Sequence, residues 1–446
     1  MKPPVPIRAA VEKMRAYNPP LEGRTKKLRL DFNENPIGCS PKVRQALAKL
    51  TSAEICSYPE QETVRRQMAK YFSVSPDELL LTNGTDEALH VIVSTFVEPA
   101  DAVLLVEPTY AMYRFYSELA GAQIAAPRYT NEMQFPWPDV LALLKGEKLP
   151  PSASSPKENG FPGAAPLSSS RVRAKQPLSK LSPEVALRPQ SKPPNPTIPS
   201  GASEFSLPFR GSELQLRQNP PQGEGALAPE EQPSCVLSSP VPPRVFFLPN
   251  PNSPTGNLLS LPEIRRILTA AKNSMVVIDE AYFEFSGVTV IPWIRRHANL
   301  IVTRTFSKTA GLAGLRLGCI FVNRHLAATM RKSQSPYPVN AAALVAAKAA
   351  MQDRAFIQRT VREVKAGRQQ LERGLKRLAM PYFPSGGNFV LVYFGDRAKK
   401  IVAQLDRKGI LLRDRSSDFS GEGYVRITAG TPAQMKRLLR ELEAIL

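Results

Sequence analysis

Short apolar runs alternate with amphipathic stretches of helical period through much of the chain. Each apolar run is continuous and bounded by turn-forming residues, which is typical of a strand buried on both faces. These runs are residues 102–106, 245–248, 275–278, 300–302 and 319–322. Helical patterns lie between many of them, at 85–96, 110–119 and 262–271. The alternation predicts an α/β fold with a mainly parallel central sheet sandwiched by helices.

The pattern changes near residue 340. One long helix is predicted over 341–378, followed by strands at 389–393 and 424–427 and a closing helix from Pro432. We interpret this part as a smaller α+β domain that the N-terminal arm joins. The predicted division is an arm with part of the small domain at 1–40, a large domain at 41–149 and 244–335, an insertion at 150–243, and the small domain at 336–446.

Proline is concentrated in one segment. Residues 150–243 hold 20 of the 44 prolines and 16 serines, with no Trp or Tyr. Such a segment cannot bury enough apolar surface to offset the entropy of ordering it, so we predict a disordered insertion. It enters just before the run at 245–248, at the amino end of that predicted strand. Ligands bind at the carboxyl ends of parallel strands, so we expect no part for it in the site.

The excess positive charge of the chain lies outside this proline-rich segment. The chain carries 59 Lys and Arg against 39 Asp and Glu, a net charge of +20, of which the insertion holds only +2. A basic body fits a nucleic-acid surface, or solvated helix faces around a site for anions. No aromatic-interleaved basic run is present, which favours the second and predicts no nucleic-acid partner.

Other classes of site and location are disfavoured. The four cysteines lack C-x-x-C spacing and the three histidines are far apart, so no metal site is expected. No run of 18 apolar residues suits a membrane span, and the N-terminus lacks the apolar region of a secretory signal. The expected location is the cytoplasm.

Three segments at the ends of predicted strands carry candidate chemistry. Residues 247–256 read FLPNPNSPTG, residues 276–282 read VVIDEAY, and residues 303–318 contain Lys308 and Arg316. Lysine forms a Schiff base with a carbonyl, and a carboxylate such as Asp279 keeps a pyridine nitrogen protonated. Arginine and the amides that start a helix suit a phosphate. Together these groups meet the needs of pyridoxal phosphate (PLP).

The sequence resembles the fold-type I PLP-dependent aminotransferases and, within them, the histidinol-phosphate aminotransferases. The resemblance covers the whole body and leaves only the insertion without a counterpart. It is carried by the lysine segment and by the motifs LDFNENP (30–36), SYPE (57–60), TNGTDE (82–87), EPTYAMY (107–113), LRD (412–414) and VRIT (425–428).

The resemblance implies roles for residues that match the family pattern. Lys308 would bind the cofactor covalently and move the substrate proton, Asp279 would pair with the ring nitrogen, Tyr282 would contact the ring hydroxyl, and Tyr110 would stack on the ring. The cofactor phosphate would be held by Gly84, Thr85, Asp86, Ser307 and Arg316, and by Tyr58 from a neighbouring subunit. A homodimer with shared sites is therefore implied. The substrate would meet Tyr17, Arg413 and Arg426.

One position departs from the family pattern. Many relatives have an asparagine before Pro-Thr-Gly that touches the ring hydroxyl, whereas this chain has Ser253 there and Asn252 one place earlier. Either Asn252 takes the contact after a small backbone shift, or Ser253 makes a weaker one.

The implied reaction is transamination between histidinol phosphate and 2-oxoglutarate, giving imidazole-acetol phosphate and glutamate in histidine biosynthesis. An aromatic amino-acid aminotransferase or a phospho-amino-acid decarboxylase on the same fold is the alternative. A non-catalytic nucleic-acid-binding protein is a remote one, disfavoured by the presence of Lys308 and Asp279.

Overall fold

A computed structural model describes residues 5–17, 19–147, 241–419, 421 and 423–446. The chain is divided at residues 162 and 231, so that residues 1–162 and 231–446 form one unit and residues 163–230 are set apart. Only the first contains described residues, and the prediction of disorder over 150–243 lies outside them except at 241–243. Within the described part, no helix is long and apolar enough to cross a membrane.

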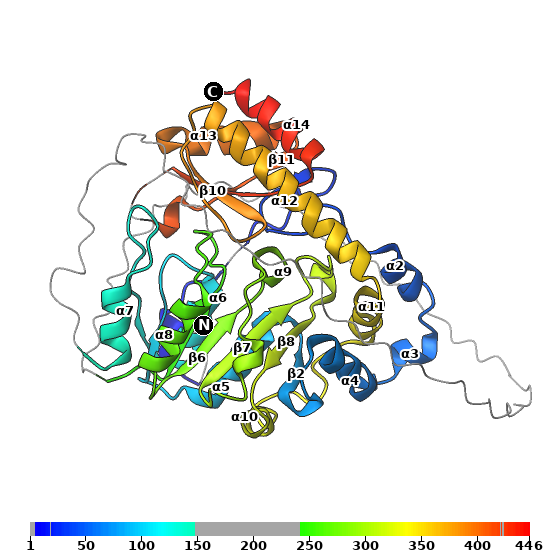
Figure 1. Cartoon of the computed structure of the whole chain (residues 1–446), viewed down its shortest axis with the longest axis vertical. Coiled ribbons are helices and arrows are strands. Elements are labelled where there is room, and N and C mark those ends of the chain that lie inside the picture. The colour runs from blue at the N-terminus through cyan, green and yellow to red at the C-terminus, as the bar shows by residue number, and fades with distance from the viewer. Residues whose placement is uncertain (1–4, 18, 148–240, 420, 422) are drawn as a thin grey trace, which may run out of the picture. The chain divides into compact units, whose positions relative to one another are not determined.

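A seven-stranded sheet forms the centre of the described unit (Figure 1). Its five strands β7, β6, β5, β3 and β4 are parallel to one another, and β8 runs antiparallel to both β7 and β2. The α/β fold with a mainly parallel sheet is thereby confirmed. In spatial order the strands are β2 (Leu79–Thr82), β8 (Gly318–Phe321), β7 (Leu300–Thr305), β6 (Met275–Asp279), β5 (Val245–Pro249), β3 (Ala102–Leu104) and β4 (Gln123–Ala125).

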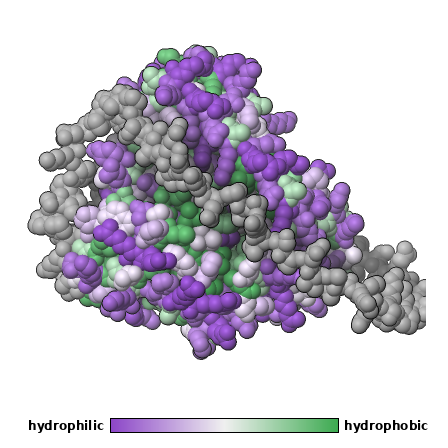
Figure 2. Space-filling view, in the orientation of Figure 1, coloured by the Kyte–Doolittle hydropathy of each residue, from purple (hydrophilic) through white to green (hydrophobic). Residues whose placement is uncertain are grey.

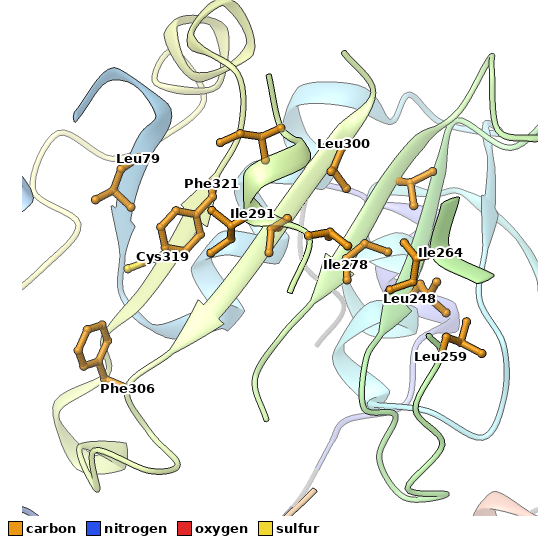
Figure 3. Close-up of a cluster of buried hydrophobic side chains, with 14 of the residues drawn as sticks. Leu79, Leu248, Leu259, Ile264, Ile278, Ile291, Leu300, Phe306, Cys319 and Phe321 are labelled. Carbon is orange, nitrogen blue, oxygen red and sulfur yellow. The ribbon is translucent and has the colours of Figure 1, made fainter. Parts of the chain in front are cut away.

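Both faces of this sheet are covered by helices, because successive residues of each strand enter opposite cores. Phe246 and Leu248 lie in one core, with residues of α4, α7, α8 and α11, while Val245 and Phe247 lie in the other, with residues of α5, α6 and α10. Figure 3 shows the first core, in which side chains of neighbouring strands share one face. The covering helices are α4 (Gln61–Phe72), α5 (Gly84–Phe96), α6 (Ala111–Ala120), α7 (Trp137–Leu144), α8 (Leu261–Ala270) and α10 (Arg324–Met330).

A second, antiparallel sheet is built from the C-terminal part of the chain. Its order is β12 (Arg413–Asp414), β13 (Tyr424–Thr428), β10 (Phe389–Tyr393) and β9 (Tyr382–Phe383). The arm strand β1 (Leu28–Arg29) pairs in parallel with β11 (Ile410–Leu411), so the arm joins this part of the chain. Helices α13 (Ala398–Arg407) and α14 (Pro432–Glu443) complete its core.

The predicted helix over 341–378 is two helices, α11 (Ala341–Met351) and α12 (Arg354–Arg377). Asp353 separates them with a non-helical backbone, and its carboxylate accepts a hydrogen bond from Ser40 Oγ. The break has a packing reason. The alanine-rich α11 packs against α2 (Pro41–Leu47), whereas the amphipathic α12 packs against α14, so one straight helix could not serve both partners.

Three strand ends define where a ligand could bind. Strands β5, β6 and β7 end side by side at Pro249, Asp279 and Thr305, with Pro249 in register with Asp279. Residues 241–244 lead into the opposite edge, where Val245 begins β5. The remaining helices of the described part are α1 (Ala9–Lys13), α3 (Ser52–Cys56) and α9 (Phe283–Ser286), with short 3₁₀ turns at Pro76–Glu78, Ile291–Trp293, Ala313–Leu315, Gly395–Arg397 and Ser416–Asp418.

Candidate active site

Asp279 is the last residue of β6 and is buried with its carboxylate hydrogen-bonded. Oδ2 accepts from the Tyr113 hydroxyl at 2.7 Å, and Oδ1 accepts from the Ala281 amide at 3.1 Å. Burial raises the pKa of Asp279, and the two donated hydrogen bonds oppose that rise because they stabilise the charged form. The carboxylate is therefore held in place by donors on its protein side.

Tyr113 was missed by the sequence reasoning. Its ring is fully buried and stacks on Phe247, with centroids 5.2 Å apart. Burial and the Asp279 charge raise the pKa of Tyr113 well above its usual value, so it remains a proton donor to that carboxylate. The signal was its position three residues after Tyr110, the residue that caps α6, because this spacing brings the two rings together.

Lys308 follows β7 by three residues and contacts the N-terminal arm. Its Nζ donates to the Phe32 carbonyl at 3.1 Å and lies 5.8 Å from the Tyr282 ring centroid. The Tyr282 hydroxyl accepts a hydrogen bond from Asn33 Nδ2 at 2.9 Å. The predicted lysine and tyrosine are thus brought together, beside an arm segment to which the sequence reasoning gave no role.

The start of α5 forms a cradle that suits an anion. Gly84 has φ of +73°, a conformation that favours glycine, and a Cβ there would lie 2.5 Å from Arg316 Nη2. The Thr85 Oγ1 atom is buried and has no hydrogen-bond partner. Arg316 Nη2 instead donates to the Asp86 carboxylate at 2.9 Å, and Ser307 Oγ accepts from Thr305 Oγ1 at 2.9 Å. Amides at the start of a 13-residue helix with these side chains can bind a phosphate.

Tyr110 connects this cradle to the Asp279 side. It precedes α6, donates to Asp86 Oδ1 at 2.8 Å, and its ring meets Tyr113 edge-on at 5.6 Å. Burial and Asp86 raise the pKa of Tyr110, and the nearby Tyr17 hydroxyl adds to the rise. Tyr17, though 45% exposed, therefore lies beside Tyr110.

Three arginines of the C-terminal part have charges that act on one carboxylate, Asp418. Arg413 and Arg426 face each other across β12 and β13, and Arg415, just after β12, pairs with the partly buried Asp418. Arg426 donates to Ser253 Oγ at 2.9 Å and to the Asp31 carbonyl at 2.6 Å. Burial, aided by Arg415 and Arg413, lowers the pKa of Arg426 to about 10. The sequence reasoning named Arg413 and Arg426 but missed Arg415.

The cationic groups of this cluster are not fully satisfied. The Nε atoms of Arg415 and Arg426 are buried and lack a hydrogen-bond partner. Buried donors without an acceptor are costly, so an anion that accepted from them would stabilise the cluster.

The sequence profile of the family described as aminotransferase class I and II matches residues 25–150 and 212–442, most of the chain. The chain belongs to this family. Its cofactor is accordingly pyridoxal phosphate, and the residues fit that group. Asp279 can pair with a ring N–H, Lys308 can bind the aldehyde carbon, and the unpartnered Thr85 hydroxyl lies in the anion cradle.

Relatives of known name match along nearly the full length of this aminotransferase. A histidinol-phosphate aminotransferase of Symbiobacterium thermophilum is 27% identical, over 99% of this chain and 98% of its own. A solved histidinol-phosphate aminotransferase from Sinorhizobium meliloti, in complex with pyridoxal-5'-phosphate, superposes with a TM-score of 0.70 at 18% identity, over 99% of this chain and 98% of its own. A solved L-threonine-O-3-phosphate decarboxylase from Porphyromonas gingivalis superposes with a TM-score of 0.63 at 21% identity, over 94% of this chain and 98% of its own.

Asn252 connects two loops of the aminotransferase. Both of its Nδ2 protons are donated, toward the Pro108 carbonyl and Thr255 Oγ1, and Oδ1 accepts from Thr109. A contact of Asn252 with the ring hydroxyl would require one of these hydrogen bonds to be exchanged. Ser253 takes a different contact from the one considered, since its hydroxyl accepts from Arg426.

Tyr58 lies on an exposed apolar patch of the aminotransferase chain. Its ring is 76% exposed and stacks on Tyr337 at 4.1 Å. Tyr58 and Tyr337 line a cavity of about 400 Å³ together with Ile55 and with Asn83, the residue before Gly84. The patch is therefore next to the start of the anion cradle.

Proposed function

We propose that this aminotransferase moves an amino group between histidinol phosphate and 2-oxoglutarate, in histidine biosynthesis. The observation that carries the proposal is the cluster of Arg413, Arg415 and Arg426 with one carboxylate. The relatives that match along nearly the full length are histidinol-phosphate aminotransferases, which supports the proposal.

The arginine cluster fits a phosphate monoester because of its charge and its free donors. Three guanidinium groups against Asp418 leave two positive charges, and a phosphate monoester carries about −1.5 to −2 at pH 7. The buried Nε atoms of Arg415 and Arg426 offer donors to its terminal oxygens. The planar guanidinium of Arg426 also suits the side-chain carboxylate of glutamate, so one pocket serves both amino donors.

The chemical step needs an electron acceptor and a base. When bound, PLP supplies a conjugated ring that accepts the electron pair left as the substrate loses its Cα proton. We assign the proton transfer to Lys308 Nζ, since a positioned lysine is a suitable general base. Asp279 holds a proton on the ring nitrogen, which requires its carboxylate to be ionised.

The remaining cofactor contacts belong to the same proposal. Tyr282 would donate its hydroxyl proton to the ring oxygen, and Tyr110 would cover the ring. The helix start at Gly84, Thr85 and Asp86, with Ser307 and Arg316, would hold the phosphate. Arg316, which now donates to Asp86, would donate to that phosphate instead. Tyr17, beside Tyr110, contacts the substrate.

We propose that two copies of the chain share their sites. The patch of Ile55, Tyr58 and Tyr337 exposes three large apolar side chains, each between 56% and 76%. A second copy covering this patch would bring Tyr58 of one chain to the cofactor phosphate of the other. Sedimentation should give a dimer mass, and a Tyr58→Phe dimer should release PLP faster than wild type. A monomeric, fully active enzyme would contradict this part.

The substrate assignment is tested by specificity. We expect kcat/KM for histidinol phosphate to exceed that for histidinol and for phenylalanine by at least about 10²-fold, because histidinol has no anionic group and phenylalanine offers the arginines a singly charged carboxylate in place of a phosphate. Faster turnover of phenylalanine would favour an aromatic aminotransferase. Carbon dioxide release from O-phosphothreonine without amino transfer would favour a decarboxylase. Either outcome would overturn the proposal.

A further inference from the structure

The arm segment Asp31-Phe32-Asn33 meets the lysine, the tyrosine and an arginine of the site, yet the function assigned above gives it no part. We infer that Asn33 is a positioning residue for transamination, which holds the Tyr282 hydroxyl so that its proton is directed to the cofactor. The inference rests on the role proposed for Tyr282 and does not depend on which amino donor the enzyme uses.

The contacts of Asn33 fix the direction of its amide. The side chain is 1% exposed, and its Oδ1 accepts from Thr428 Oγ1 at 3.1 Å. The same Thr428 oxygen accepts from the Asn33 backbone N–H at 3.0 Å, so its own proton is the one given to Oδ1. Nδ2 must then face Tyr282, where it donates to the hydroxyl oxygen at 2.9 Å.

The hydrogen bond from Asn33 leaves the Tyr282 hydroxyl free to act as a donor. An amide N–H only donates, so the phenol oxygen is an acceptor in this pair and keeps its proton for another partner. Within the described part of the chain, no second hydrogen bond to the Tyr282 hydroxyl is present. The free proton is therefore available for the ring oxygen of PLP, the contact proposed for Tyr282.

The backbone of Asn33 forms a turn that brings the arm into contact with the site. Its φ is +53°, in the left-handed region that asparagine enters more readily than most residues. Asn388 Nδ2 donates to the Asn33 carbonyl at 3.1 Å and anchors the turn. The two preceding carbonyls then reach opposite sides of the site, with Phe32 O on Lys308 Nζ and Asp31 O on Arg426 Nη2.

Two substitutions of Asn33 distinguish the effect of its side-chain amide from that of its backbone conformation. Asn33→Gly keeps the left-handed backbone and removes the amide, whereas Asn33→Asp keeps the size and replaces the donor by an acceptor. We expect both to lower kcat about tenfold, since each removes the donor to Tyr282. Asn299→Ala is the matched control, because the Asn299 amide is also partly buried but bonds to Ala271 and Ser274 at the other end of the sheet.

The decisive readout is spectroscopic. The ring oxygen of PLP is conjugated with its chromophore, so losing a hydrogen bond there changes the pH at which the visible band of the bound cofactor titrates. We expect Tyr282→Phe, Asn33→Gly and Asn33→Asp to shift this midpoint in the same direction, and Asn299→Ala to leave it unchanged. The cofactor dissociation constant and the melting temperature, measured on each variant, report any general loss of structure.

A double-mutant cycle tests whether Asn33 acts through Tyr282. In the Tyr282→Phe background, Asn33→Gly should lower kcat less than twofold further, because the hydroxyl that it positions is already absent. Equal fold-losses in both backgrounds, or an unchanged midpoint in Asn33→Gly, would overturn the inference. An unchanged midpoint in Tyr282→Phe would instead refute the proposed Tyr282 contact, and with it the inference. The assay uses glutamate or any accepted donor, so a wrong substrate assignment leaves it intact.

Discussion

The two sheets contribute opposite kinds of surroundings to one site. On the large-sheet side the charged groups have partners, since Asp279 accepts from Tyr113 and Ala281, and Lys308 donates to Phe32. On the small-sheet side Arg415 alone of the three arginines pairs with Asp418, the charges of Arg413 and Arg426 also act on that carboxylate, and the buried Nε atoms of Arg415 and Arg426 have no acceptor. On the large-sheet side the charged groups already have hydrogen-bond partners without a ligand. On the small-sheet side an anion would accept hydrogen bonds from the two Nε atoms and offset the excess positive charge.

The same contrast extends to the surface. Residues 336–446 contain 20 Lys and Arg against 10 Asp and Glu, so a quarter of the chain carries +10 of the +20 net charge. The exposed positions of α12 are Arg, Lys, Gln and Ala, with no acid among them. Hydrophilic residues predominate over the small-sheet helices in the upper part of Figure 2. If the substrates are anions, as proposed, a surface of this charge should raise their local concentration.

Lys308→Ala should have the largest effect, because it removes the only assigned base on the large-sheet side. We expect the rate of the first half-reaction, measured as a single-turnover absorbance change, to fall about 10³-fold or more with every amino donor. Lys272→Ala, which changes an exposed lysine, is the control. Normal turnover by Lys308→Ala would remove the central assignment.

Arg426→Ala should affect the small-sheet side alone. Loss of a buried charge that pairs with substrate costs about 2–5 kcal/mol, so kcat/KM for histidinol phosphate should fall by about 10² or more. The visible band of bound cofactor should be retained. Arg437→Ala, an exposed arginine on α14, provides the comparison. If Arg426→Ala loses the cofactor band instead, the two sides are not separable as described.

Tyr113→Phe should affect the large-sheet side alone and more weakly. Its hydroxyl donates to Asp279, so removing it takes away a bond that favours the carboxylate and raises the pKa of Asp279 further. The ionised form of Asp279 must pair with the ring nitrogen. The acid limb of the pH profile of kcat/KM should therefore move to higher pH, and kcat/KM at pH values below the new limb should be about tenfold lower than that of wild type.

The control for this shift is Tyr129→Phe, which removes another buried tyrosine hydroxyl of the large-sheet part without a contact to Asp279. The two profiles should differ at acidic pH and converge at high pH. Coincident profiles would show that the Tyr113 hydroxyl has no influence on the Asp279 charge.

Replacing residues 150–240 by a three-residue Gly-Ser linker should have the smallest effect, because it touches neither side. The flanking residues are already close, as a Cβ on Gly146 would lie 2.9 Å from Pro242 Cδ. They adjoin the amino end of β5, opposite Asp279 and Lys308. We expect kcat/KM within twofold of wild type. A large loss in a dimer that still folds would give the insertion a part in the site.

The sequence was most informative where a predicted strand is followed by a chemically reactive side chain. Asp279 and Lys308 follow long apolar runs, and parallel strands bring such ends to one edge, so their meeting was predictable. Strands β2 and β4 were not predicted, although β2 is as short and apolar as the run at 319–322 that was. The break at Asp353 was missed because it depends on a tertiary contact with Ser40.

Partners within the site were harder to predict than its central residues. Asn252 and Ser253 have similar polarity, and only the three-dimensional contacts reveal that one joins loops while the other meets Arg426. Asn33 contacts Tyr282 across 249 residues of sequence, a pairing that local pattern cannot indicate. The arm motif that contains Asn33 was visible, but its purpose was not.

The most direct test of the whole account is one absorbance spectrum. Purified PLP-loaded protein is mixed with histidinol phosphate in the absence of 2-oxoglutarate, so that only the first half-reaction can occur. The account predicts that the visible band is lost and replaced by the pyridoxamine band, and that 2-oxoglutarate then restores it. A spectrum that stays unchanged with histidinol phosphate, while phenylalanine converts it, would contradict the account.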